Sequence, residues 1–194
     1  MHVVRVVRVL LVVLLVAVVV GAGSSVLSAR PDLESAKRNV DAAWATVAPA
    51  LDHRYAQLAV VNNQLASVPG PVQALAGNTR TALAHWNDVR QHGSVAAQVA
   101  AANDVEAIAR RLLATEAASP RVRGKATLLS DVGKYLGMST STQSAADDFN
   151  TSVDKYEHER RGPVRAVVAS ALGDGAIPVL DNTGALGAQG PASS

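Results

Sequence analysis

The sequence begins with a long stretch that carries no charged residue. Val9–Val20 is an unbroken run of twelve apolar residues, and the uncharged stretch continues to Leu27. As a helix, these 19 residues would be roughly 28 Å long, close to the hydrocarbon core of about 30 Å in a bilayer. A helix without a polar face suits lipid better than the surface of a globular domain. We therefore predict a transmembrane anchor over residues 9–28, after a short basic tail over residues 1–8.

A cleaved signal peptide is the competing interpretation of this stretch. Arg5 and Arg8 form a basic start, and Ser28 and Ala29 are small residues that suit a cleavage site. The two arginines favour a cytoplasmic N-terminus, although Arg30 and further basic residues follow the stretch. Because large domains are translocated largely regardless of such charges, we expect a single-pass cell-membrane protein with an extracytoplasmic body. If the leader is cleaved, the same body would be a secreted helical binding protein.

The rest of the chain is balanced in charge. The formal net charge is +2, and Arg5 and Arg8 account for all of it. A neutral surface of mixed sign lacks the electrostatic field that nucleic-acid binding needs, and an aromatic content of 3% leaves few side chains on which bases could stack. We therefore expect no nucleic-acid partner. Cysteine is absent, which excludes disulfides and thiolate chemistry.

The body shows apolar residues at helical spacing. Pro31 stands where a first helical position is expected, and Pro49 lies inside the pattern that follows. An interior proline removes one backbone hydrogen bond, so Pro49 predicts either a kinked helix or two abutting helices, and the unbroken pattern favours the kink. A periodicity of three, four or seven residues predicts a long helix packed along one face. The residues of this expected seam are Leu33, Val40, Trp44, Val47, Leu51, Leu58, Val61, Leu65 and Val68.

Proline and glycine divide the remaining chain into further helices. Pro69-Gly70-Pro71 separates the first body helix from a second, and Gly93-Ser94 separates the second from a third, which ends at Ser119-Pro120. A longer helix is expected over residues 127–161. Its middle is weak because glycine, serine and threonine are poor helix formers. Gly162-Pro163 ends it, and a short apolar helix follows.

These elements define the expected domains and fold class. Residues 30–173 are predicted to form a helical bundle, and the Gly/Ala/Pro-rich residues 174–194 a disordered tail, because they have little to bury. The expected fold is all-α, with an N-terminal single transmembrane helix followed by an antiparallel bundle of long helices.

Motifs along the body point to one family. Asn39–Trp44 is followed by Arg54-Tyr55, Glu116–Pro120 closes a later helix, and Phe149–Tyr156 lies in the last long one. Over roughly residues 5–173 these motifs resemble those of the LemA family, whose last helix carries Tyr-Asn-x-x-Val-x-x-Tyr-Asn. The positions that match its motifs or core are Val40, Ala43, Trp44, Leu51, Arg54, Tyr55, Phe149, Asn150, Val153 and Tyr156.

The chain also departs from that family. It lacks the proline that usually follows the arginine, it has Ser and Thr over residues 138–142 in place of a Thr-Glu pair, and Glu157 and Gly162 replace Asn and Phe. The resemblance, to a family whose molecular function is uncertain, implies an anchored antiparallel helical bundle. It implies no catalytic residue.

The remaining candidates for chemistry have simpler structural interpretations. Asp154 and His158 are four residues apart but lack a third ligand, so we expect a solvated helix face and no metal site. Arg121, Arg123 and Lys125 cluster near an expected helix start and are a candidate anion contact, although a charged loop is the simpler interpretation. The histidines, including the pair His85 and His92, are interpreted as surface residues. No cofactor and no catalytic residue is predicted.

The sequence therefore favours a membrane-anchored, non-enzymatic scaffold or interaction protein of the cell envelope. Its expected partners are the membrane, through residues 9–27, and other envelope proteins, and a homo-oligomer is left open. The alternative is an envelope enzyme or an accessory subunit of one. Only the location and the scattered histidines support that alternative.

Overall fold

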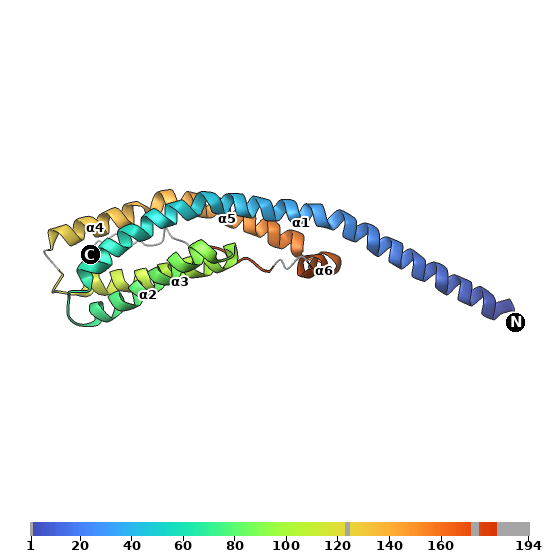
Figure 1. Ribbon diagram of the computed structural model, residues 1–194, viewed down its shortest axis with the longest axis horizontal. Coiled ribbons are helices and arrows are strands. Elements are labelled where there is room, and N and C mark those ends of the chain that lie inside the picture. Colours follow the sequence, from blue (N-terminus) through green and yellow to red (C-terminus); the bar gives the residue numbers. More distant parts are fainter. Residues whose placement is uncertain (1, 123–124, 172–174, 182–194) are drawn as a thin grey trace, which may run out of the picture. The chain divides into compact units, whose positions relative to one another are not determined.

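The computed structural model describes residues 2–122, 125–171 and 175–181, and this part of the chain is all-helical apart from its connections and its last segment (Figure 1). For residues 2–29, 163, 164 and 171 it gives the course of the helix without the side chains. The expected all-α fold class is confirmed. The helices are α1 (His2–Leu65), α2 (Pro71–His92), α3 (Val95–Ala118), α4 (Ala126–Gly137), α5 (Ser139–Arg160) and α6 (Pro163–Ala171).

The chain divides into two compact units that share the long helices α1 and α5. Among the described residues, the smaller unit comprises residues 2–39, 154–171 and 175, and the larger unit comprises residues 40–122, 125–153 and 176–181. In the larger unit, the second half of α1 packs with α2, α3, α4 and the first part of α5. This unit is the helical bundle that carries the two polar networks and the strap described below.

The expected apolar seam forms core along α1 and in the turn that follows it. All of its residues from Leu33 to Val68 are at most 4% exposed, and most of them are fully buried. Burying a side chain such as valine or leucine stabilises a fold by about 1.5–3 kcal/mol relative to leaving it in water. The helical period of the apolar residues therefore identified the packed face of α1 correctly.

Pro49 does not divide α1, which runs from His2 to Leu65 as one helix. Pro49 and Ala45, four residues earlier, both lie on the exposed side of α1. The carbonyl of Ala45 loses its usual N–H partner to the proline ring, and water can replace that partner on an exposed face. Of the two sequence-based alternatives, a pair of abutting helices is not what the structure shows, because Pro49 lies within one helix.

The helix expected over residues 127–161 is two helices in the structure. Helix α4 ends at Gly137 and α5 begins at Ser139, with Met138 between them. The Thr142 hydroxyl donates a hydrogen bond to the Met138 carbonyl over 2.8 Å. Gly133 and Gly137 weaken the end of α4, because glycine has the lowest helix propensity after proline. The weak stretch noticed in the sequence is therefore a break between two helices.

The end of the described chain departs from the disordered tail expected from residue 174 onward. Residues 176–181, which we call the strap, form a non-helical segment held by side chains of α3 and α5. Two buried apolar residues, Ile177 and Leu180, offset the low apolar content of the tail as a whole. Residues 174 and 182–194 lie outside the described residues, so the expectation for them remains a prediction.

The expected membrane anchor also lies outside the residues whose side chains are described. Helix α1 includes residues 9–28 as part of its continuous backbone. From Arg30 onward, no helix has a stretch long and apolar enough to cross a bilayer.

The turn between α1 and α2 requires a glycine. Gly70 has φ 113° and ψ −157°, a region that is essentially restricted to glycine, and Pro71 then starts α2. We expect Gly70→Ala to lower the free energy of unfolding by about 1–3 kcal/mol, measured by urea denaturation. Gly77→Ala, inside α2 with open space around the position, is the matched control and should raise stability by about 0.5–1 kcal/mol. Equal effects of the two changes would contradict this account of the turn.

Candidate functional site

A buried ion pair joins α1 to α3. The Nε of Arg54 donates to Oε1 of Glu106 over 2.9 Å, and its Nη2 donates to Oε2 over 3.2 Å. The side chains of the two residues are 0% and 2% exposed. Such a bidentate guanidinium–carboxylate pair fixes both distance and orientation. It therefore sets the register of α1 against α3 in the interior of the bundle.

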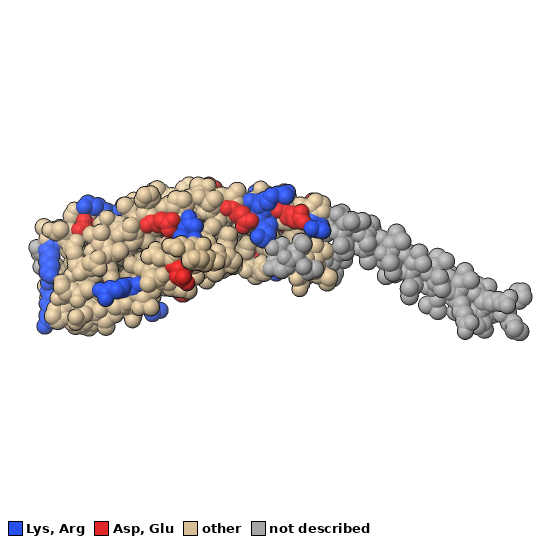
Figure 2. Space-filling view, in the orientation of Figure 1, with Lys and Arg blue, Asp and Glu red and all other residues tan. Residues whose placement is uncertain are grey.

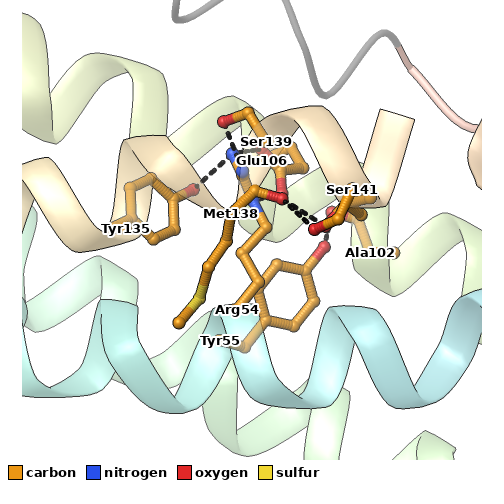
Figure 3. A network of polar contacts seen from close by, with 9 residues as sticks. Arg54, Tyr55, Ala102, Glu106, Tyr135, Met138, Ser139 and Ser141 are labelled. Carbon is orange, nitrogen blue, oxygen red and sulfur yellow. Dashed lines mark hydrogen bonds and ion pairs between the residues drawn. The ribbon is translucent and has the colours of Figure 1, made fainter. Parts of the chain in front are cut away.

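The same guanidinium reaches the junction of α4 and α5, as Figure 3 shows. Its Nη1 donates to the Ser139 hydroxyl over 2.6 Å, and its Nη2 also donates to the Tyr135 hydroxyl over 3.2 Å. The guanidinium carbon lies 4.3 Å from the centroid of the Tyr135 ring. Arg54 thus contacts α3, α4 and the first residue of α5. The break at Met138 places Ser139 at the start of α5, where it accepts this bond.

Burial changes the acid–base behaviour of this cluster. Burial raises the pKa of Glu106, although the Arg54 guanidinium opposes that shift. Burial, followed by the nearby Glu106 carboxylate, raises the pKa values of Tyr55 and Tyr135. Both phenols therefore stay protonated at neutral pH, and the Tyr55 hydroxyl donates to the Ala102 carbonyl over 3.1 Å. The cluster is a closed set of hydrogen bonds that ties helices together.

A second network lies on the α1, α2 and α3 side of the bundle. The indole N–H of Trp86 donates to Asp52 over 3.0 Å, and Arg90 Nε donates to the same carboxylate over 3.2 Å. The indole N–H of Trp44 donates to Gln98 over 2.7 Å. Gln98 in turn donates to the Gly93 carbonyl over 2.9 Å, which ties α3 to the turn before it. Each buried indole thus has an acceptor for its N–H.

Two of the hollows in the larger unit are lined by residues of α1, α2 and α3. One of about 260 Å³ is lined by Asp52, Tyr55 and Trp86, whose polar atoms are already engaged. The other, of about 390 Å³, lies between α2 and α3 and is lined by His85 and Asp104 among others. Small-molecule pockets usually range from about 300 to 1,000 Å³ and bring polar groups together at one point. Thr81 and His85 both line the second hollow, but the Thr81 hydroxyl donates to the Gly77 carbonyl over 3.3 Å, a bond within its own helix.

The family-motif positions lie mainly in the core. Arg54 and Tyr55 belong to the buried cluster, and Trp44 contacts Phe149 at 5.1 Å between ring centroids. Asn150 instead bonds to the strap. The remaining positions Val40, Leu51, Val153 and Tyr156 are at most 1% exposed, whereas Ala43 is half-buried.

The structure does not bring the other candidates together. His92 lies next to Asp88 on the same helix, 3.7 Å from its carboxylate, and does not line the hollow that His85 lines. His158 and Asp154 are exposed, and no group of three His, Asp or Glu side chains suited to a metal occurs in the described part of the chain. Arg121 donates to the Pro69 carbonyl over 3.1 Å, Lys125 is exposed, and Arg123 lies outside the described residues.

Sequence reasoning missed the residues that complete the two networks. The sequence assigned no role to Glu106, Gln98 or Asp52, and Ser139 stood out only as part of a weak helical stretch. A signal existed for Glu106, because it follows Ala102 and Val105 and precedes Ala109 on the apolar face of α3. A charged residue within an apolar face predicts a buried partner. The pairing with Arg54, 52 residues away, requires the fold.

The Asp131 carboxylate on α4 should make the stability of the fold depend on pH. Asp131 accepts bonds from Lys134 over 2.9 Å and from Gln64 over 2.7 Å, and these contacts lower its pKa. A lowered folded-state pKa stabilises the fold above the unfolded-state pKa, and this contribution disappears as the pH falls through the folded-state value. We expect Asp131→Asn to destabilise the protein at pH 7 and to have less effect below pH ~3, by urea denaturation. An equal effect at every pH would contradict the assignment.

Comparisons of the chain with protein-family models, with curated proteins and with solved structures found no match.

Proposed function

We propose that this chain is a non-enzymatic scaffold or interaction protein of the cell envelope, of the LemA type, held at the membrane by residues 9–27. Its helical body then presents surfaces to other envelope proteins on the extracytoplasmic side. The continuity of α1 from His2 to Leu65 carries this proposal. The apolar stretch and the first core helix of the body belong to one element, so an anchor would be joined to the body without a linker.

The position of the small residues Ser28 and Ala29 favours retention of this stretch. They lie within α1, with helix on both sides. The cleaved-signal alternative would place a processing site in the middle of a continuous helix. Retention would leave α1 intact.

The body supports an interaction role more than a catalytic one. The cluster of ionisable groups around Arg54 and Glu106 is buried, and it connects helices. Cations and anions are interspersed on the face seen in Figure 2, so no single-sign field dominates it. Helix α3 also exposes small side chains such as Ala100 and Ala114, over which a partner helix can pack closely.

Fractionation of the full chain tests the anchor. We expect the intact, uncleaved mass in carbonate-washed membranes. Val13→Asp combined with Val16→Asp should release the chain, because each charge at the centre of a membrane helix disfavours insertion by about 2.5–3.5 kcal/mol. Val13→Leu with Val16→Leu is the matched control and should stay in the membrane. A soluble wild-type product that lacks about 28 residues would overturn the anchor and favour a secreted binding protein.

Crosslinking in cells tests the scaffold role. A photoreactive residue at Leu129 on α4, or at Val60 on α1, would sample partners because these side chains are 52% and 45% exposed. We expect discrete adducts with envelope proteins that also co-purify with the uncrosslinked chain. If neither position captures an envelope protein at native expression, the scaffold proposal fails.

A further inference from the structure

The strap is held by the side chain of an asparagine on α3. Asn103 donates from Nδ2 to the Val179 carbonyl over 2.9 Å, and its Oδ1 accepts the backbone N–H of Asp181 over 2.9 Å. These two backbone groups lie on either side of Leu180 in the sequence and on the same edge of the strap. A single amide group therefore replaces the backbone partner that a neighbouring β-strand would supply.

A second asparagine, on α5, holds the opposite edge. Asn150 donates from Nδ2 to the Leu180 carbonyl over 3.0 Å, and its Oδ1 accepts the Leu180 backbone N–H over 2.8 Å. All four backbone polar groups around Leu180 are thus bonded by two side chains from different helices. These bonds recognise a non-helical main chain at one position and do not depend on its side chains.

Side-chain contacts add a sequence preference. Leu180 is 2% exposed and Ile177 is 8% exposed, whereas Val179 is 45% exposed. The Asp181 carboxylate lies 3.8 Å from the Arg110 guanidinium. The surface that holds the strap, which we call the acceptor surface, therefore favours a five-residue pattern that matches residues 177–181. This pattern is an apolar residue, two exposed residues, a leucine and an acidic residue.

We propose that the surface of α3 and α5 around Asn103 and Asn150 is a binding site for an extended peptide segment of a partner protein, and that the strap occupies it in cis. Backbone bonds that supply affinity, with pockets for chosen side chains that supply specificity, are a recurring mode of peptide recognition. The partner segment would carry a leucine followed by an acidic residue, because those are the strap residues that meet a buried site and a cation. This inference rests on the proposed interaction role and specifies the chemistry of one partner.

Occupancy by the strap has a consequence for affinity. A segment in the same chain is present at a high effective concentration, so it competes with any partner. The apparent association constant for a partner equals the intrinsic constant multiplied by the fraction of molecules whose site is free. The strap therefore acts as a built-in competitor, and weakening it should expose the site.

Peptide binding to the purified full-length chain tests this proposal. The probe is a fluorescent peptide with the sequence of residues 176–181, Ala-Ile-Pro-Val-Leu-Asp. We expect it to bind the Leu180→Ser chain at least about tenfold more tightly than the wild-type chain, because the serine weakens the resident strap. A control peptide with serine in place of leucine should bind at least about tenfold more weakly than the probe.

Variants of the acceptor surface complete the test. Asn103→Ala with Asn150→Ala, added to Leu180→Ser, should weaken probe binding at least about tenfold because four hydrogen bonds are removed. The exposed Asn63→Ala change is the matched control and should leave binding unchanged. If the Leu180→Ser chain keeps its helicity and monomer mass but does not bind the probe, the proposal is overturned. A wild-type dimer that dissociates on Leu180→Ser would also overturn it, since a second copy would then be the occupant.

A second measurement covers the case in which Leu180→Ser fails to fold. The chain has no cysteine, so Val179→Cys gives one labelling position on an exposed residue of the strap. Adding the unlabelled probe should increase the mobility of a spin label there, and no change at saturating probe would overturn the proposal. If the probe did not bind but crosslinking still captured envelope proteins, the scaffold role would remain supported and only the peptide site would be rejected. Probe binding without any envelope partner in cells would remove the scaffold role alone.

Discussion

Replacing Glu106 with alanine is expected to lower the free energy of unfolding by about 3–5 kcal/mol, the usual penalty when one member of a buried ion pair is removed. The Arg54 guanidinium is 0% exposed and would lose both of its bonds to the carboxylate. Ser139 and Tyr135 would remain as neutral partners, and neither compensates the charge. Urea denaturation followed by circular dichroism measures this loss, and Arg54→Ala should produce a loss of similar size.

Replacing both residues distinguishes the loss of the ion pair from the penalty of leaving one charge buried without its partner. Arg54→Met with Glu106→Leu removes both charges and keeps apolar volume, and such exchanges are often neutral or stabilising. We therefore expect the double variant to be more stable than either single variant. Arg111→Ala, an exposed arginine on α3, should change stability by less than about 0.5 kcal/mol. A double variant as unstable as the two single losses added together would show that the pair does not act as one unit.

This pair also marks the limit of what the sequence predicts. The apolar seam of α1 follows from local periodicity, because residues three and four apart share one face of a helix. The seam residues from Leu33 to Val68 are accordingly buried as predicted. Arg54 lies between Leu51 and Leu58 in the same stretch and was singled out only through the family resemblance. Its partner Glu106, 52 residues later, could not be predicted from periodicity. Periodicity identifies a face, whereas a partner on another helix requires the tertiary arrangement.

The break between α4 and α5 shows a related limit. The sequence indicated a weak helix over residues 138–143, because serine, threonine and glycine have low helix propensity. Propensity alone could not decide between a frayed helix and a break. In the structure the break puts Ser139 within 2.6 Å of the Arg54 guanidinium. A tertiary contact thus accompanies the departure from helix, and that contact is not visible in local sequence.

The strap was missed for a compositional reason. Residues 174–194 are rich in Gly, Ala, Pro and Ser, and such composition predicts disorder because little apolar surface is available to bury. Ile177 and Leu180 are among the few large apolar residues of this segment, and both are buried. Four backbone bonds from Asn103 and Asn150 add to them. The average composition of the 21 residues 174–194 cannot reveal that six of them are ordered.

Trp86→Ala is expected to produce a loss comparable to that of Glu106→Ala, about 3–5 kcal/mol, by creating a cavity in the core. The Trp86 side chain is 1% exposed, and its ring lies 5.2 Å from that of Tyr55 and 6.4 Å from that of Trp44, both in edge-on arrangements. Truncation removes both ring contacts and the bond to Asp52. Denaturation in urea would measure the loss, with the exposed neighbour His85→Ala as a control that should change stability by less than about 0.5 kcal/mol.

Trp86→Phe distinguishes the packing of this ring from its hydrogen bond. Phenylalanine keeps most of the apolar area and gives up the N–H, so we expect a smaller loss of about 1 kcal/mol. Asp52 retains Arg90 as a partner and is partly exposed, which limits the penalty for its lost bond. If Trp86→Phe proved as destabilising as Trp86→Ala, the bond to Asp52 would dominate and α2 would be held to α1 mainly by polar contacts. The larger loss on Trp86→Ala would instead establish that ring packing joins α1 to α2.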